Sequence, residues 1–301
     1  MRTGTAVTLL TLALASVAVQ RAPARAQDLS NNLSNGMVDI AYGEPSESEY
    51  RPIYERLKAR QVLEELRQFL APLRLPRKVL VQIEQCDKGT ARYTEGGPVT
   101  ICYQYIHELE KYAEKISPDA RTARGVSRED AVVGGFVQVV LNGMSQAVFD
   151  ILEVPVWGRE EDAADKLAGF LMLQFGTDTA RRLLNGAAYF FEASDRTWTG
   201  SDFAATRGTQ AQRFYNYLCV AYGGDPKAFK DFVEASGAGA RPGQPAELRI
   251  DLLPQHRAEQ CHKEYNDLQF AFNQTIMPSV DQDMLAKVLA RRDWLRSGDG
   301  K

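Results

Sequence analysis

Histidine and serine side chains could support hydrolytic chemistry, but neither type has the spacing that a conventional site requires. The chain has three histidines, at positions 107, 256 and 262. His107 and Glu108 begin like an HExxH helix, in which two imidazoles one turn apart bind zinc, but Lys111 replaces the second histidine. Ser145 lies outside a GxSxG elbow. These residues indicate neither a zinc site of their own nor a serine hydrolase.

A long apolar stretch with few polar interruptions predicts a helix over residues 128–152, and an acidic segment follows it. Residues 136–150 read FVQVVLNGMSQAVFD, and residues 153–165 read EVPVWGREEDAAD. Glu160, Glu161 and Asp162 are expected in the first turn of the next helix, where the helix macrodipole stabilises negative charge. Helix stability alone would explain these carboxylates.

The two segments together resemble a family of bacterial putative metallopeptidases, formally a domain of unknown function. In that family an HExxHA helix is followed by a PxxGREEDAAD segment, and the second half is intact here from Pro155 to Asp165. Other landmarks of the family lie at residues 86–103, 213–223 and 253–265. The resemblance implies an α+β, helix-dominated, zincin-like single domain with a small sheet packed near helix 128–152.

The first half of the family signature is replaced. Ala147 matches the alanine that follows the second histidine, so Asn142 and Gln146 stand at the two histidine positions and Gly143 at the glutamate. In a zincin the imidazoles bind zinc and the glutamate activates the bound water. Amides are weak zinc ligands, and loss of a general base alone costs about 10²–10⁴ in rate. We expect no intact catalytic site and no bound metal or other cofactor.

The resemblance also implies roles for two carboxylates of the second half. Glu161 corresponds to the third zinc ligand of gluzincins, and Asp165 to the acid that braces a ligand histidine. Because no histidine remains to be braced, we interpret Glu161 and Asp165 as vestigial positions that record ancestry.

The N-terminus predicts export. Arg2 precedes an apolar run from Thr5 to Val19, and residues 24–26 have the small-x-small form of a signal-peptidase site. We expect residues 1–26 to be a signal peptide that is cleaved near Ala26, which places the mature protein in the periplasm or outside the cell. No membrane span is expected after cleavage, since no later stretch reaches the ~20 apolar residues that a spanning helix needs. The alternative is a tether formed by an uncut segment.

Four cysteines in an exported chain predict two disulfides, with three possible pairings. We expect Cys86 to pair with Cys102 across the turn at residues 95–98, and Cys219 with Cys261 between two helices. Free buried thiols are the alternative.

Local patterns predict the elements that would position these residues. Residues 27–48 are polar and are expected to form a flexible lead-in to a domain spanning residues 49–301. A helix over 49–69 would precede two strands, 78–83 and 99–103, which we expect to form a hairpin. Further helices are expected near residues 104–117, 128–152, 159–175, 178–194, 208–222, 225–235 and 254–274.

The net charge of −3, with lysine and arginine scattered, argues against a nucleic-acid partner. We expect an exported, catalytically inactive homologue of a zinc metallopeptidase that binds a peptide or protein in a retained groove lined by Asn142, Gln146 and Glu161. One alternative is an active metallopeptidase with an unconventional metal site that includes Glu161. A second is a structural envelope protein in which Met144 and Phe149 fill the zinc position and close the groove.

Overall fold

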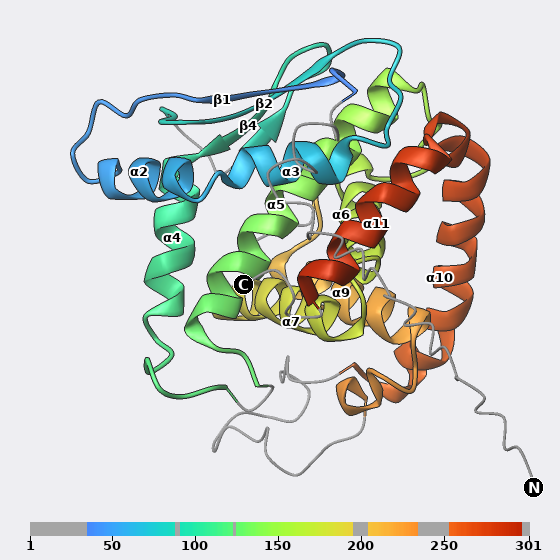
Figure 1. The fold of residues 1–301 in the computed structure, drawn as a ribbon. Helices are drawn as coiled ribbons and strands as arrows, with labels where there is room; N and C mark the ends of the chain where they lie inside the picture. The colour runs from blue at the N-terminus through green and yellow to red at the C-terminus, as the bar shows by residue number, and fades with distance from the viewer. Residues whose placement is uncertain (1–34, 88–90, 123–124, 195–203, 234–252, 297–301) are drawn as a thin grey trace, which may run out of the picture.

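The structure is a computed structural model that describes residues 35–87, 91–122, 125–194, 204–233 and 253–296. It is helix-dominated with one small mixed sheet, as the sequence predicts. Figure 1 shows the sheet on one side of a group of helices, with α10 and α11 along the flank. The predicted signal peptide and its cleavage site lie outside the described residues.

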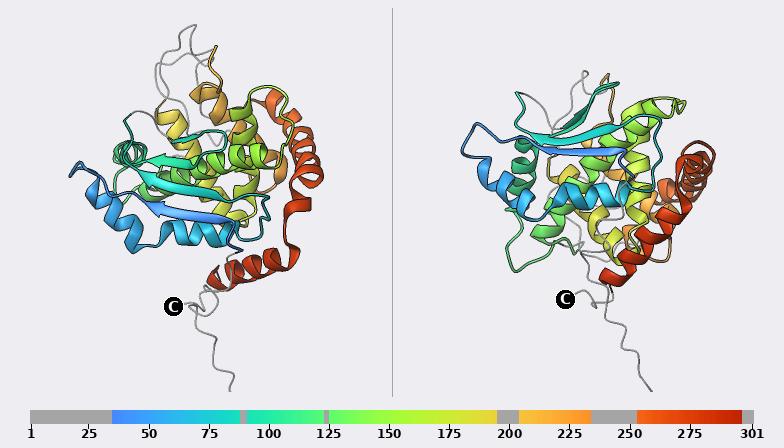
Figure 2. Two further views of the ribbon diagram at one scale, coloured as in Figure 1. Left: turned by 90° about the horizontal axis from the view of Figure 1, so that it is seen from above. Right: turned by 45° about the horizontal axis from the view of Figure 1, so that its top comes forward.

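Four strands form the sheet in the order β1-β2-β4-β3. Their bounds are Val38–Tyr42 for β1, Val79–Glu84 for β2, Ala91–Tyr93 for β3 and Val99–Cys102 for β4. β1 and β4 run parallel to β2, and β3 runs antiparallel to β4. β4 is buried along its whole length because it lies between two strands and packs against α5. The view from above in Figure 2 shows the sheet lying across this helix.

The predicted hairpin of residues 78–83 and 99–103 is wrong. Both segments are strands, but they run parallel, with Val81 opposite Val99. The turn at residues 95–98 instead joins β3 to β4. β3 escaped prediction because its three residues, Ala-Arg-Tyr, are fewer than the roughly four to eight over which a strand pattern can be recognised.

Three further expectations differ from the structure. β1 lies inside the predicted flexible lead-in, where pairing with β2 orders residues 38–42. The predicted helix 49–69 is divided into α2, Arg51–Ala59, and α3, Val62–Leu70, because Gln61 takes a left-handed conformation that a right-handed helix does not accommodate. The predicted helix 225–235 is described up to residue 233, and within that part the short 3-10 helix η1, Lys230–Phe232, is the one helical segment.

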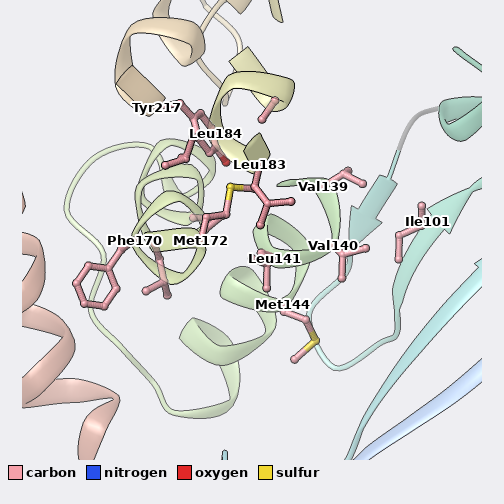
Figure 3. Packing of buried hydrophobic residues seen from close by; sticks show 14 of the residues in the cluster. Ile101, Val139, Val140, Leu141, Met144, Phe170, Met172, Leu183, Leu184 and Tyr217 are labelled. Carbon is pink, nitrogen blue, oxygen red and sulfur yellow. The ribbon is translucent and has the colours of Figure 1, made fainter. Parts of the chain in front are cut away.

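The remaining predicted helices are present with shifted ends, and one unpredicted helix follows them. They are α4 Tyr103–Ala113, α5 Arg128–Ile151, α6 Glu160–Leu173, α7 Thr177–Ala193, α9 Gln210–Gly224, α10 Gln255–Thr275 and, unpredicted, α11 Gln282–Arg296. α5 is central, because it packs against α4, α6, α7 and the sheet. Figure 3 shows Val140 and Leu141 of α5 between Ile101 of β4 and Leu183 and Leu184 of α7.

Burial explains the apolar composition of α5. Among the described residues it is the one helix long and apolar enough to cross a membrane, and 78% of its most apolar window is buried inside the fold. Ser127 and Asp130 form a capping box at its start. α5 is therefore the core helix around which the sheet and the other helices pack.

Both predicted disulfides are present. Cys86 and Cys102 join the ends of the parallel strands β2 and β4, and Cys219 and Cys261 join α9 to α10. No described cysteine is free. Two disulfides are typical of proteins that fold in an oxidising, extracytoplasmic compartment.

Candidate functional site

α5 and α6 bring the two halves of the sequence signature side by side. The loop between them contains two residues with positive φ, Glu153 at 52° and Gly158 at 102°. Glycine is favoured at position 158 because other residues rarely adopt that backbone conformation. α6 then starts at Glu160, with Glu160, Glu161 and Asp162 in its first turn, as predicted.

Asn142 and Gln146 lie one turn apart on α5 and form a chain of amide hydrogen bonds toward α6. Gln146 Nε2 donates to Asn142 Oδ1 at 2.8 Å. Asn142 Nδ2 donates to Asp165 Oδ1, also at 2.8 Å, and lies 3.5 Å from the main-chain oxygen of Glu161. The structure thus brings Asn142, Gln146 and Asp165 into one connected group, while Glu161 approaches it through its backbone.

Asp165 is the centre of this buried group. Its side chain is 1% exposed and accepts hydrogen bonds from Gln138 Nε2 at 3.0 Å and from Arg213 Nε and Nη2 at 2.6 and 2.9 Å. Tyr217 contributes a longer contact of 3.4 Å from its hydroxyl. A buried carboxylate needs such compensation, because burial without a counter-charge is costly.

Arg213 of α9 is the counter-ion of Asp165. Its guanidinium carbon lies 4.4 Å from the centre of the Phe191 ring, so α7 contributes a cation–π contact to the same group. Burial alone would lower the pKa of Arg213, but the charge and hydrogen bonds of Asp165 outweigh burial and hold the pKa above its usual value. α5, α6, α7 and α9 are therefore joined through one ion pair.

These residues do not fit zinc. The oxygen of Asn142 already accepts from Gln146, and the Asn142 nitrogen donates to Asp165. The Asp165 carboxylate is bonded to both guanidinium donors of Arg213. Within the described part of the chain, no group of three or more His, Cys, Asp or Glu residues could hold a metal ion. The donor set is an amide pair and a neutralised carboxylate, which zinc does not prefer.

The histidines have other contacts. His107 Nε2 lies 3.2 Å from Glu49 Oε1, and its ring packs edge-on against Tyr50. His262 Nδ1 lies 3.1 Å from the main-chain oxygen of Gly223, which ties α10 to α9. His256 is exposed in the first turn of α10. None of these contacts includes Asp165 or Glu161.

Gly143 allows α5 to approach the sheet closely. A Cβ atom built on Gly143 would lie 2.6 Å from Val99 Cγ1, a separation that real Cβ atoms do not show. Val99 is fully buried in β4, and a β-branched side chain has few alternative rotamers. Gly143, which the sequence resemblance aligns with the glutamate of HExxH, therefore has a packing function in this chain.

Gly143→Ala should destabilise the protein despite the higher helix propensity of alanine. Overpacking costs about 1–3 kcal/mol, and the propensity gain returns at most about 1 kcal/mol. We expect a net loss of about 1–2 kcal/mol in urea unfolding monitored by circular dichroism. The double variant Gly143→Ala/Val99→Ala should lose less unfolding free energy than the sum of the losses of the two single variants, because Val99→Ala removes the atom that clashes. Additive losses would contradict this close contact.

A cleft of about 530 Å³ opens beside the amide chain. Its walls come from the β3–β4 hairpin, the last turns of α5, the α5–α6 loop and the start of α6, and its lining residues are Tyr93, Glu95, Gln146, Phe149, Asp150, Glu153, Val154, Val156 and Glu160. Gln146 is the residue that belongs both to the cleft and to the buried polar group. The cleft thus lies next to Asn142 and Gln146, the two residues that the sequence resemblance aligns with histidines.

The lining of the cleft differs from the groove that the sequence predicts. Gln146 lines the cleft, but Asn142 is 7% exposed and turned to Asp165, and the neighbouring Glu160 takes the place expected for Glu161. Met144 is 1% exposed and belongs to the core, and Phe149 forms part of the wall. Neither residue closes the cleft.

Three members of the buried polar group were not identified from the sequence. They are Gln138, one turn before Asn142 on α5, and Arg213 and Tyr217 on α9. The one signal available was general: a buried carboxylate such as Asp165 needs a buried cation as its partner. The segment that begins at Arg213 was noted as a landmark, but nothing in the sequence paired it with Asp165, 48 residues away.

The comparisons with known proteins identify a family. A family model described as a putative metallopeptidase matches residues 42–276. The match begins at the last residue of β1 and ends just after α10, so it includes both disulfides, the buried polar group and every lining residue of the cleft. No curated protein and no solved structure matched the chain.

Proposed function

Because the chain belongs to the putative metallopeptidase family, we propose that it is a catalytically inactive, zincin-like member that binds a peptide or protein segment in the cleft beside the former metal position. It acts after export, in the periplasm or outside the cell. Its two disulfides suit that compartment.

The observation that carries this proposal is the hydrogen-bonded path from Gln146 through Asn142 to the Asp165–Arg213 ion pair. It uses both polar atoms of the Asn142 amide and one N–H of Gln146 for internal bonds. Gly143, at the position of the general base, offers no side chain and has no room for one against Val99. Both the metal ligands and the base are thus missing from this site, and hydrolysis by a zinc-bound water has no residues to support it.

The cleft supports binding in place of hydrolysis. It combines apolar wall residues, Phe149, Val154 and Val156, with polar groups such as Gln146 and Tyr93, a mixture that is typical of ligand sites. Trp157, next to Val156 in the loop, is 96% exposed. Tryptophan is among the residues that most often anchor a protein or peptide partner.

Metal content and peptidase activity test the catalytic part of the proposal. The mature chain, purified from periplasm and incubated with zinc before dialysis, should retain far less than one zinc per molecule by mass spectrometry. It should not cleave labelled casein, with or without a chelator. One zinc per chain together with chelator-sensitive cleavage would contradict the proposal and favour the alternative, an active metallopeptidase with an unconventional metal site, for which Glu161 is the candidate ligand.

A further inference from the structure

We propose that the segment bound in the cleft is cationic, with a lysine or arginine side chain placed among Glu95, Glu153 and Glu160. This inference rests on the proposed binding function and names the chemistry of the partner. The three carboxylates come from three different elements, the β3–β4 turn, the α5–α6 loop and the first turn of α6, and all of them line the same cleft.

Among the described residues, no cation forms an ion pair with any of these three glutamates, and all three are exposed. The arginines near these glutamates in the sequence or beside the cleft have other partners, and Arg92 lies 3.8 Å from Glu84 Oε1. Arg77 pairs with Asp150, and Arg159 Nε lies 2.7 Å from Asp162 Oδ2. The cleft therefore has three uncompensated negative charges around an apolar wall.

Asp150, the fourth acid of the lining, serves the structure of the cleft. It accepts hydrogen bonds from the Tyr93 hydroxyl and from Arg77, and from the main-chain nitrogen of Gly96 at 3.2 Å. The hydrogen bond from Tyr93 and the charge of Arg77 hold the pKa of Asp150 below its usual value. Asp150 thus fixes the β3–β4 hairpin to the end of α5, and its charge is already neutralised.

This arrangement favours a cation next to an apolar side chain. Like charges that line a concave, apolar wall concentrate their field inside it, and this raises the local concentration of an oppositely charged partner. Phe149, Val154 and Val156 can contact the aliphatic stem of lysine or arginine, or an apolar neighbour in the peptide. At the inner end, the Gln146 amide has a second N–H and a carbonyl oxygen that suit a peptide backbone.

Fluorescence anisotropy of the mature chain with three dye-labelled hexapeptides tests this inference. The probes are Gly-Leu-Lys-Lys-Leu-Gly and the same peptide with both lysines replaced by glutamine or by glutamate. We expect the lysine peptide to bind at least about tenfold more tightly than the glutamine peptide, and the glutamate peptide not to bind. Raising the salt concentration should reduce the difference between the lysine and glutamine peptides.

A matched pair of variants locates the effect. Glu95→Gln/Glu153→Gln/Glu160→Gln should weaken binding of the lysine peptide by about tenfold or more and leave the glutamine peptide unchanged. The control, Glu55→Gln/Glu114→Gln/Glu129→Gln, changes the net charge equally at exposed residues outside the cleft and should bind as the wild type does. Thermal unfolding by circular dichroism confirms that both variants fold.

The outcomes separate the two proposals. Equal binding of all three peptides, lost on replacing the wall residue Val156 by tryptophan, would overturn the cationic preference and leave the binding function in place. Equal weakening by both triple variants would also overturn it, because the attraction would then belong to the whole surface. If none of the three peptides binds, both proposals are overturned.

Discussion

Asp165→Asn is expected to lower the free energy of unfolding by about 3–5 kcal/mol, because it leaves the buried Arg213 without a counter-charge. The side chain of Asp165 is 1% exposed and that of Arg213 is 11% exposed, so solvent offers little screening. An amide nitrogen at this position would also face the donors of Gln138, Asn142 or Arg213. Since domains of this kind are stable by only about 5–15 kcal/mol, the loss should be a large part of the total.

Urea unfolding of a double-mutant cycle measures this ion pair. Asp165→Asn and Arg213→Met should each be strongly destabilising, and the double variant should lose clearly less than the sum of the two, since neither buried charge is then left alone. As a control, Asp267→Ala breaks the exposed pair with Lys263 and should leave the unfolding free energy nearly unchanged. Additive losses in the cycle would mean that Asp165 and Arg213 do not stabilise one another.

A stabilising role for Asp165 is compatible with our interpretation that the first half of the signature is replaced in this chain. In the family, the resemblance assigns this acid to the bracing of a metal-binding histidine. Here its partners are two amides and an arginine, and these join α5, α6 and α9. The residue is thus useful to the fold whether or not a metal is present.

Local signals were sufficient for the two helices of the site and for the disulfides. The apolar pattern of α5 and the acidic first turn of α6 predicted both helices of the site, and the family resemblance implied that Asn142 and Gln146 lie near residues 161–165. Both disulfide pairings followed from four cysteines, a turn and a loop. In each case the relevant interaction depends on residues close in sequence or on few possible combinations.

Long-range pairings carried no comparable signal. β2 and β4 are parallel, so the chain between them, which contains β3, must return to the other end of the sheet before β4 begins. The composition of either strand does not reveal its partner. The left-handed Gln61 that separates α2 from α3 involves neither glycine nor proline. Likewise, the packing function of Gly143 depends on Val99, which is distant in sequence and becomes a neighbour only when α5 lies on the sheet.

Restoring two histidines should return zinc to this position. In Asn142→His/Gln146→His, the imidazoles would lie one turn apart on α5, and the one at position 142 could donate to Asp165 Oδ1, as the Asn142 amide now does at 2.8 Å. We expect about one zinc per chain by mass spectrometry, where the wild type retains almost none. The matched control Asn142→Ala/Gln146→Ala removes the amide chain without adding ligands and should bind no more zinc than the wild type.

Glu161 can be tested in the same background. If its side chain completes the ligand set, adding Glu161→Gln to the two-histidine variant should weaken zinc affinity by at least about 10–100-fold, the cost typical of losing a supporting group at a zinc site. Unchanged affinity would exclude Glu161 as a ligand. Failure of the two-histidine variant itself to take up zinc would show that positions 142 and 146 do not form a metal site in this fold.

Hydrolysis requires one more step, and the packing of Gly143 determines how it must be made. Gly143→Glu alone would clash with Val99, so the base has to be introduced together with Val99→Ala, which opens space at the sheet. The four-residue variant, with both histidines, should cleave labelled casein in a chelator-sensitive way. The two-histidine variant should bind zinc and remain inactive, since it lacks a base at position 143, worth about 10²–10⁴ in rate. If the two variants cleave casein equally, or if neither does although both bind zinc, the assignment of position 143 to the general base is contradicted.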